Sequence, residues 1–178
     1  MKSRIPSRRV TLLGVGVLTT AALTVTVGSN AFAGAGPAPR SSTVSASPAA
    51  QAAKEARDKR IALAFMNLAF NQKQPQKAAD LYPGDSYIQH NPQIADGKAA
   101  FVTWATNFVK AAPDLKLDVK RVLADGDLVM LHSHVTVSAT DRGTAAADIL
   151  RLKDGKIVEH WDVLEAVPET SANDNTMF

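Results

Sequence analysis

The chain has 178 residues, of which 46% are hydrophobic and none is cysteine, and its formal net charge is +3. This length suits one compact domain, and without cysteine no disulfide can support it, so stability has to come from the core. Four of the basic residues lie in the first 33 residues, which contain no acid, and the remainder carries 16 Lys and Arg against 17 Asp and Glu. This balance gives no indication of a nucleic-acid partner, which would need basic residues clustered on one face.

Residues 1–33 are similar to an export signal. A basic start precedes the apolar run Val10–Val27, and Ala31-Phe32-Ala33 follows as a small-residue cleavage site. The segment Ser7–Leu13 contains two adjacent arginines and resembles the twin-arginine motif. We therefore expect cleavage before Gly34, a secreted or extracytoplasmic protein, and only transient contact with the membrane. The alternative is an uncleaved membrane anchor, since the apolar run is nearly long enough to span a bilayer.

Residues 34–53 consist largely of Ala, Ser, Pro and Gly. Such a stretch cannot bury enough apolar surface to offset the entropy of ordering it, so we predict a disordered linker. The folded domain is expected over residues 54–178. It begins with an amphipathic helix, because apolar residues recur at helical spacing at Ile61, Phe65, Leu68 and Ala69.

Two further helices are predicted. Pro75 suits the first turn of a short helix through Leu81, since its missing N–H would be unpaired there in any case. A short extended piece follows at Tyr87–His90, and the third helix runs from Gly97 to Pro113. One face of the third helix carries Phe101, Trp104, Ala105 and Phe108.

The rest of the domain is predicted to form four strands, over residues 115–124, 127–139, 145–152 and 156–165. Asp-Gly joins the first two and the last two, and this dipeptide is typical of type I′ hairpin turns. Helices followed by an antiparallel meander predict an α+β fold. In this fold a cone-shaped, curved antiparallel sheet wraps around the N-terminal helices and encloses a pocket.

The first turn predicts the face of each side chain in its hairpin. If Ala124 pairs with Asp127, then His132 and His134 lie on the inner face together with Met130. The outer face then carries apolar side chains that suit a homodimer interface: Val129, Leu131, Val135 and Val137, with Ile149 and Val158 from the second hairpin.

The second turn makes a similar prediction. Pairing Lys153 with Lys156 places Asp148 opposite Trp161 on a face shared with Leu150. The same register turns His160 to the other face. The loop at residues 140–143 does not fix the register between the two hairpins. Any even-sum pairing across it would bring Asp148 to the face of His132 and His134 inside the cone, and this is the arrangement we expect.

An acid and two imidazoles in an apolar cavity favour proton-transfer chemistry, because burial of each is costly unless it is compensated. We expect catalytic roles for Asp148, His134 and His132. Substrate-binding roles are expected for His90, Tyr87, Trp161, Met130, Leu150 and Trp104. In the alternatives, the histidines are packed core residues, or His90, His132, His134 and Asp148 bind a metal.

Three segments carry a resemblance to a known family. Tyr87–Pro92, Gly97–Phe101 and Asp148–Asp162 resemble the SnoaL-like polyketide cyclase family of the nuclear transport factor 2-like superfamily. The resemblance covers roughly Lys54 to Phe178. It implies an α+β cone and acid–base catalysis without metal or other cofactor, with Asp148 as the acid/base and His134 as its assistant.

Two functions are compatible with these expectations. The first is an exported acid–base enzyme that catalyses aldol cyclisation, isomerisation or dehydration of a small hydrophobic carbonyl compound. The second is a non-catalytic protein that uses the same cone to hold a small hydrophobic ligand. The polar set inside the cone favours the enzyme, because a binding protein has little reason to bury it.

Overall fold

The computed structural model describes residues 47–178, so the predicted export signal and most of the predicted linker lie outside the described residues. We expected the first helix to begin at Lys54, but α1 (Pro48–Met66) begins six residues earlier. Ser47 caps it, with its hydroxyl accepting from the Ala50 N–H at 3.2 Å, and proline occupies the first turn. An N-cap and an N-terminal proline outweigh the shortage of apolar residues in this stretch. Within residues 47–178, no helix is long and apolar enough to cross a membrane.

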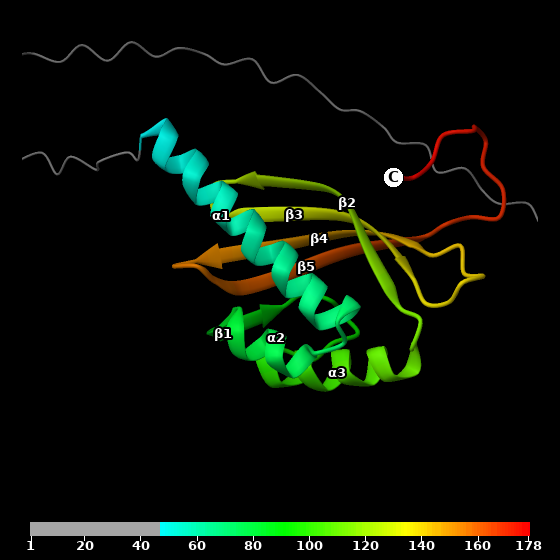
Figure 1. Ribbon diagram of the computed structural model, residues 1–178, viewed down its shortest axis with the longest axis horizontal. Helices are drawn as coiled ribbons and strands as arrows, with labels where there is room; N and C mark the ends of the chain where they lie inside the picture. Colours follow the sequence, from blue (N-terminus) through cyan, green and yellow to red (C-terminus); the bar gives the residue numbers. More distant parts are fainter. Residues whose placement is uncertain (1–46) are drawn as a thin grey trace, which may run out of the picture. The chain divides into compact units, whose positions relative to one another are not determined.

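The other helices lie close to their predicted positions. α1 continues into a π-helical turn, η1 (Asn67–Asn71), and α2 (Pro75–Leu81) and α3 (Lys98–Ala111) follow. Asn71 ties η1 to the sheet, because its side chain accepts from the Leu117 N–H and donates to the Leu117 carbonyl at 2.8 and 2.9 Å. The α+β prediction is confirmed, with helices on one face of a curved, unclosed sheet (Figure 1).

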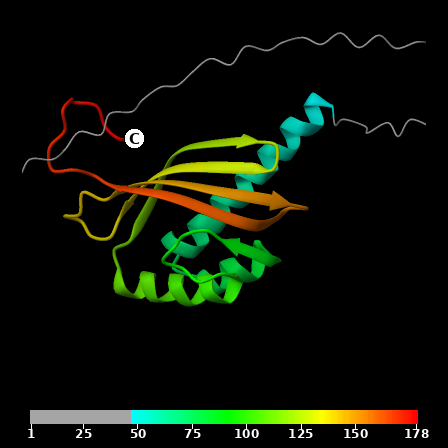
Figure 2. The same ribbon diagram turned by 180° about the vertical axis from the view of Figure 1, so that it is seen from behind.

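The sheet contains one strand from before α3 and four from after it. The strands are β1 (Pro83–Gln89), β2 (Lys116–Asp125), β3 (Leu128–Thr136), β4 (Thr144–Lys153) and β5 (Lys156–Ala166). Their spatial order is β1-β5-β4-β3-β2, in which β1 runs parallel to β5 and the other neighbours are antiparallel. Figure 2 shows this order from the side of the sheet away from α1. The parallel pairing brings the Tyr87–Pro92 segment beside the last strand.

Only the second of the two predicted turns has the expected geometry. Lys153 pairs with Lys156, and both Asp154 and Gly155 have positive φ, as a type I′ turn requires. In the first hairpin the two loop residues are Gly126 and Asp127, so Asp125 pairs with Leu128. Gly126 alone takes the positive φ there. The predicted pairing of Ala124 with Asp127 is therefore wrong.

Each hairpin also contains a β-bulge that reverses the faces beyond it. Lys120 is the extra residue of β2, and Val158 is the extra residue of β5. Because side chains alternate with a period of two, one inserted residue moves every later side chain to the opposite face relative to its partner strand. In β5 this insertion turns His160 inward and Trp161 outward, which contradicts the predicted faces of both residues.

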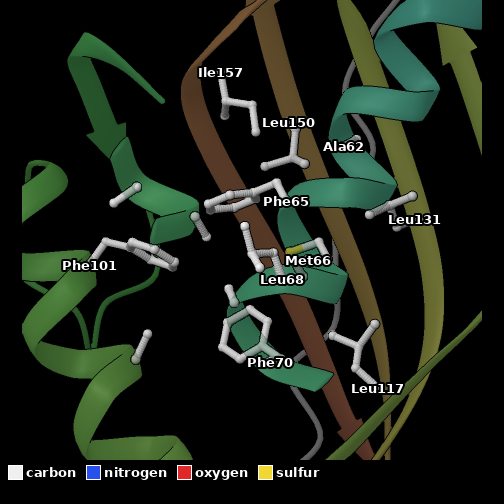
Figure 3. Close-up of a cluster of buried hydrophobic side chains, with 14 of the residues drawn as sticks. Ala62, Phe65, Met66, Leu68, Phe70, Phe101, Leu117, Leu131, Leu150 and Ile157 are labelled. Carbon is white, nitrogen blue, oxygen red and sulfur yellow. The ribbon is translucent and has the colours of Figure 1, made fainter. Parts of the chain in front are cut away.

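The core lies between the helices and one face of the sheet (Figure 3). Phe65 of α1 packs there against Phe101 of α3, with ring centroids 5.2 Å apart. From the sheet, Leu131 and Leu150 are completely buried. The prediction that Val129 and Leu131 lie on the outer face is therefore wrong. Both faces of β3 carry apolar residues, and only the packing of α1 decides which of them is inner.

Candidate active site

Four polar side chains meet on the inner face of the sheet. Tyr87 comes from β1, Asp148 from β4, and His160 and Asp162 from β5. The register places Asp148 directly opposite Asp162, with His160 two residues away from Asp162 on the same face. Two acids directly opposite each other destabilise a sheet, so this pairing works against stability and marks a functional site.

Asp148 and His160 form a hydrogen-bonded dyad. The Nε2 atom of His160 lies 3.2 Å from Oδ1 of Asp148, and the two side chains are only 10% and 8% exposed. A histidine and a carboxylate at this distance can pass a proton between them. The dyad therefore has the composition and geometry of a buried acid–base pair.

Gln89 determines which nitrogen of His160 faces the acid. The Oε1 atom of Gln89 accepts from the Asn91 backbone N–H at 2.9 Å, which identifies this atom as the amide oxygen. The same oxygen lies 2.9 Å from Nδ1 of His160, so Nδ1 must carry a proton to donate. The other nitrogen, Nε2, is left to share one proton with Asp148. Whether that proton is on the acid or on the imidazole, the dyad is neutral overall.

The second oxygen of Asp148 has no hydrogen-bond partner. Oδ2 is buried, and no donor in the described part of the chain reaches it. An unpaired buried acceptor costs free energy, on the order of 1–3 kcal/mol. A ligand that donates to Oδ2 would recover this cost.

Asp162 is the second acid of the site and is held from the loop after β1. Its Oδ2 accepts from the Asn91 side-chain amide at 2.7 Å. Asn91 in turn accepts from the Gln93 N–H at 2.8 Å, so the Asn91-Pro92 turn is tied to β5. Unlike Asp148, Asp162 is only partly buried.

A pocket opens beside this polar group. Its volume is about 40 Å³, which is room for roughly three water molecules. Its lining residues come from α1, η1, β1, α3, β4, β5 and the loop before α3: Phe65, Met66, Phe70, Tyr87, Gln89, Ile94, Phe101, Trp104, Asp148, His160 and Asp162. The polar group therefore forms part of the wall of a small cavity whose other lining residues are mostly aromatic or aliphatic.

Burial raises the pKa of the Tyr87 phenol, and the charges of Asp148 and Asp162 raise it further. The phenol therefore stays neutral at physiological pH and keeps its proton. Gln89 Nε2 lies 3.5 Å from the Tyr87 oxygen, a long and weak donor contact. The hydroxyl of Tyr87 is thus available as a donor to a ligand in the pocket.

The same group has the chemistry of a metal site. Three potential metal-ligating atoms, one from each of Asp148, His160 and Asp162, all lie within 4.8 Å of one another. A metal ion on His160 would have to replace the contact between Nε2 and Asp148, because this nitrogen has one lone pair or one proton to offer. As it stands, the geometry is that of a hydrogen-bonded acid–base pair.

The structure separates His132 and His134 from Asp148. Both lie on the outer face of β3, which contradicts the predicted convergence of these histidines on the acid. His132 lies 3.2 Å from the Arg121 guanidinium, and His134 Nε2 lies 2.8 Å from the Arg142 carbonyl oxygen. The ring of Phe178 stacks on His134 with centroids 4.3 Å apart, so the C-terminus covers this side of the sheet. The two histidines lie outside because Val129, Leu131 and Ser133 pack on the inner face of β3, and side chains alternate between the faces of a strand.

Three predicted pocket residues also lie outside. Met130 shares the outer face of β3, while His90 and Trp161 stack on each other with centroids 4.7 Å apart. His90 Nε2 lies 2.8 Å from Glu159 Oε1, and the Arg151 guanidinium lies over the Trp161 ring, 5.5 Å from its centroid. The four ligands proposed for a metal alternative, His90, His132, His134 and Asp148, are therefore not brought together.

Three of the other predicted residues, Tyr87, Trp104 and Asp148, line the pocket. Leu150 is on the same face as Asp148 but is buried in the core. Sequence reasoning missed His160, Gln89 and Asp162. A bulge cannot be read from alternation, but Gln89 and Asp162 both lie within the segments that carried the family resemblance.

The chain is similar to a known protein family. Residues 62–160 match the SnoaL-like domain family. None of the curated proteins compared with the chain matches it.

Solved structures share the fold. TsrD from Streptomyces laurentii is 18% identical, with a TM-score of 0.54 over 62% of this chain and 89% of TsrD. A candidate polyketide cyclase from Bacillus cereus is 26% identical, with a TM-score of 0.54 over 63% of this chain and 77% of its own. AclR, a candidate hydroxylase from Streptomyces galilaeus, is 25% identical, with a TM-score of 0.52 over 62% and 90%. Since the domain match spans more than half of the chain, the protein belongs to the SnoaL-like domain family.

Proposed function

We propose that this chain is an acid–base enzyme of the cyclase or isomerase type that acts on a small carbonyl compound. The observation that carries the proposal is the buried contact of 3.2 Å between Asp148 and His160 at the end of an apolar pocket. Solved structures of related fold whose names include polyketide cyclase are consistent with it. Fold alone would not support it, because one fold hosts many chemistries.

The dyad can move a proton as follows. With Asp148 ionised and His160 protonated, the free Oδ2 removes a proton from the carbon next to a carbonyl group. The electron pair of the broken C–H bond passes to the carbonyl oxygen, which becomes an enolate oxygen. The Tyr87 hydroxyl is available to donate to that oxygen. In isomerisation the protonated Asp148 then returns the proton to another carbon of the conjugated enolate. In cyclisation the enolate carbon attacks a second carbonyl of the substrate, and the protonated Asp148 gives its proton to the alkoxide oxygen that forms.

His160 supports this role by balancing charge. An isolated carboxylate buried among apolar side chains would stay protonated and could not act as a base. An imidazolium beside Oδ1 stabilises the ionised acid while leaving Oδ2 free, and Gln89 keeps the ring in the orientation this needs. The pair can thus supply both the base and its conjugate acid in one turnover.

Proton abstraction can be measured without knowledge of the natural substrate. We expect the protein to catalyse deuterium incorporation next to the carbonyl of small ketones in D₂O, followed by proton NMR. Asp148→Asn and His160→Gln should each lower the catalysed rate by about 10²–10⁴-fold. Asp85→Asn, which changes an exposed acid on β1, is the matched control and should leave the rate unchanged.

Thermal unfolding of each variant shows whether it folds. If folded Asp148→Asn exchanges deuterium as fast as the unaltered protein, the acid–base role of Asp148 is excluded. If no member of a panel of small ketones exchanges above the background rate while ligands still bind, the chain is a binding protein of the same fold.

We also propose two further features that the sequence predicts. Export is supported by the signal-like residues 1–33, and a mature mass that begins at Gly34 would establish it. Homodimer formation is supported by exposed apolar side chains on the strands, such as Leu123 and Val163 at 55% and 68% exposure. Sedimentation at micromolar concentration would distinguish a dimer from a monomer.

A further inference from the structure

We infer that the pocket selects a ligand carrying a protonated amine and disfavours one carrying a carboxylate, so that the substrate class is a small amine-bearing carbonyl compound. The carbonyl part of this inference rests on the proposed function. The amine part rests on the charges, the unpaired acceptor and the lining of the pocket.

The pocket contains two acids, and only one of them, Asp148, has a basic partner. Asp148 and Asp162 both line it, and its lining includes neither lysine nor arginine. Among the described residues, the only ion pair of Asp148 is with His160, and Asp162 has none. Because the dyad of Asp148 and His160 is neutral overall, ionised Asp162 leaves the site with one uncompensated negative charge. A low-dielectric cavity lined by one sign of charge attracts the opposite charge.

A separate observation indicates a missing donor. The Oδ2 atom of Asp148 is buried and has no hydrogen-bond partner among the described residues. The Asp148 side chain is only 8% exposed and lines the pocket. An ammonium group offers three donors and no acceptor, so it can donate to a free lone pair of Asp162 and to one lone pair of Oδ2, whose second lone pair remains for proton transfer. A carboxylate would offer only acceptors to these oxygens and would add a like charge.

The size and the walls of the pocket suit a small cationic group. Its volume of about 40 Å³ holds an ammonium group with a short carbon chain rather than a large head group. Tyr87, Phe101 and Trp104 line it, and aromatic rings attract cations through the negative potential of their faces. Burial first, and then the charges of Asp148 and Asp162, raise the pKa of the Tyr87 phenol, which therefore keeps its proton.

Binding of three isosteric probes to the full-length protein tests the inference. We would titrate propylamine, propanol and propionate at pH 7 in the presence of EDTA, and measure Kd by NMR chemical-shift changes. Propylamine should bind at least tenfold more tightly than propanol, and propionate more weakly than either. Equal binding of amine and alcohol, tighter binding of propionate, or no amine binding at about 100 mM would overturn the inference; a tenfold preference corresponds to about 1.4 kcal/mol.

A substitution assigns the selectivity to the pocket. Asp162→Asn should reduce the preference for propylamine over propanol by about tenfold, while Glu165→Gln, an exposed acid on the same strand, should not change it. A preference that persists unchanged in folded Asp162→Asn contradicts the inference. The selectivity of the unaltered protein needs no variant, so misfolding of Asp162→Asn would leave the first test decisive.

The two proposals can fail separately. Amine selectivity without deuterium exchange of any ketone would exclude the enzymatic proposal and keep the binding inference. Exchange of neutral ketones that is no slower than exchange of aminoacetone, together with equal binding of amine and alcohol, would exclude the inference and keep the enzymatic proposal.

Discussion

At the scale of single residues, the site depends on one side chain that is not itself a proton carrier. Gln89 receives hydrogen bonds from the Asn91 N–H and from His160 through one oxygen, each at 2.9 Å. The tautomer of a histidine is decided by the partner of its second nitrogen. Gln89 is therefore a positioning residue for the dyad, and its effect is exerted through His160.

Replacing Gln89 tests this role. In Gln89→Leu the Nδ1 atom loses its acceptor, so we expect a mixture of tautomers and a slower deuterium exchange, by roughly tenfold or more. Gln89→Glu keeps an oxygen acceptor and should retain the Nδ1 proton. The readout is the ¹⁵N shift of the His160 ring, which a general loss of stability would not change. A single unchanged tautomer in Gln89→Leu would rule the role out.

At the scale of elements, the loop between β3 and β4 depends on a glycine. Gly143 has a φ of +87°, and a Cβ at this position would meet the His134 ring and the Val135 carbonyl oxygen. Asp141 holds the same loop by accepting from the Val137 and Gly143 N–H groups, each at 2.9 Å. These hydrogen bonds also lower the pKa of Asp141.

Two alanine substitutions separate backbone strain from steric conflict. Gly126→Ala, at a φ of +63° with nothing within 4 Å of the added Cβ, should cost about 1 kcal/mol from the positive φ alone. Gly143→Ala should cost more, about 2–4 kcal/mol, because the conflict is added to the strain. Urea denaturation gives both free energies of unfolding. Equal losses in the two variants would show that the conflict relaxes without cost.

At the scale of the whole molecule, folding stabilises the ionised form of several carboxyl groups. The Arg151 guanidinium lowers the pKa of Glu159 and of Asp127, with hydrogen bonds of 2.8 Å to each. A carboxyl whose pKa is lowered on folding stabilises the protein above its unfolded pKa. That contribution is lost as the pH falls through the folded value.

The expected consequence is a decrease in stability in acid. Because the unfolded pKa values of Asp and Glu lie near 4, Tm should be nearly constant from pH 7 to about 5 and should fall steadily below about pH 4. Arg151→Met removes the partner of two of these acids, so its Tm should fall less steeply between about pH 4 and 3. Lys110→Met, which removes a charge at the end of α3, is the control. Scanning calorimetry across this pH range gives the slopes, and identical slopes would exclude a role for Arg151.

Much of this protein could be predicted from local sequence. Helical periodicity and Pro75 placed the helices, Asp154-Gly155 placed the last hairpin, and the register of that hairpin placed Asp148 on the face of Leu150. These features depend on neighbours in the chain: the spacing of apolar residues, the fixed φ of proline, and the positive φ of a type I′ turn. Asp148 could be assigned to its face because side chains alternate along β4 from the Asp154-Gly155 turn, and the predicted pairing of Lys153 with Lys156 at that turn was correct.

The histidine of the dyad was decided only by the tertiary structure. His132 and His134 lie outside and His160 lies inside, the reverse of the prediction, because α1 packs on the Val129 and Leu131 face of β3 and because Val158 is an extra residue in β5. β3 carries apolar residues on both faces, and alternation is the same whichever face is buried. The face of β3 is decided by the packing of helices that are distant in sequence, and that of His160 by the bulge at Val158, so the members of the proposed proton-transfer pair could not be predicted.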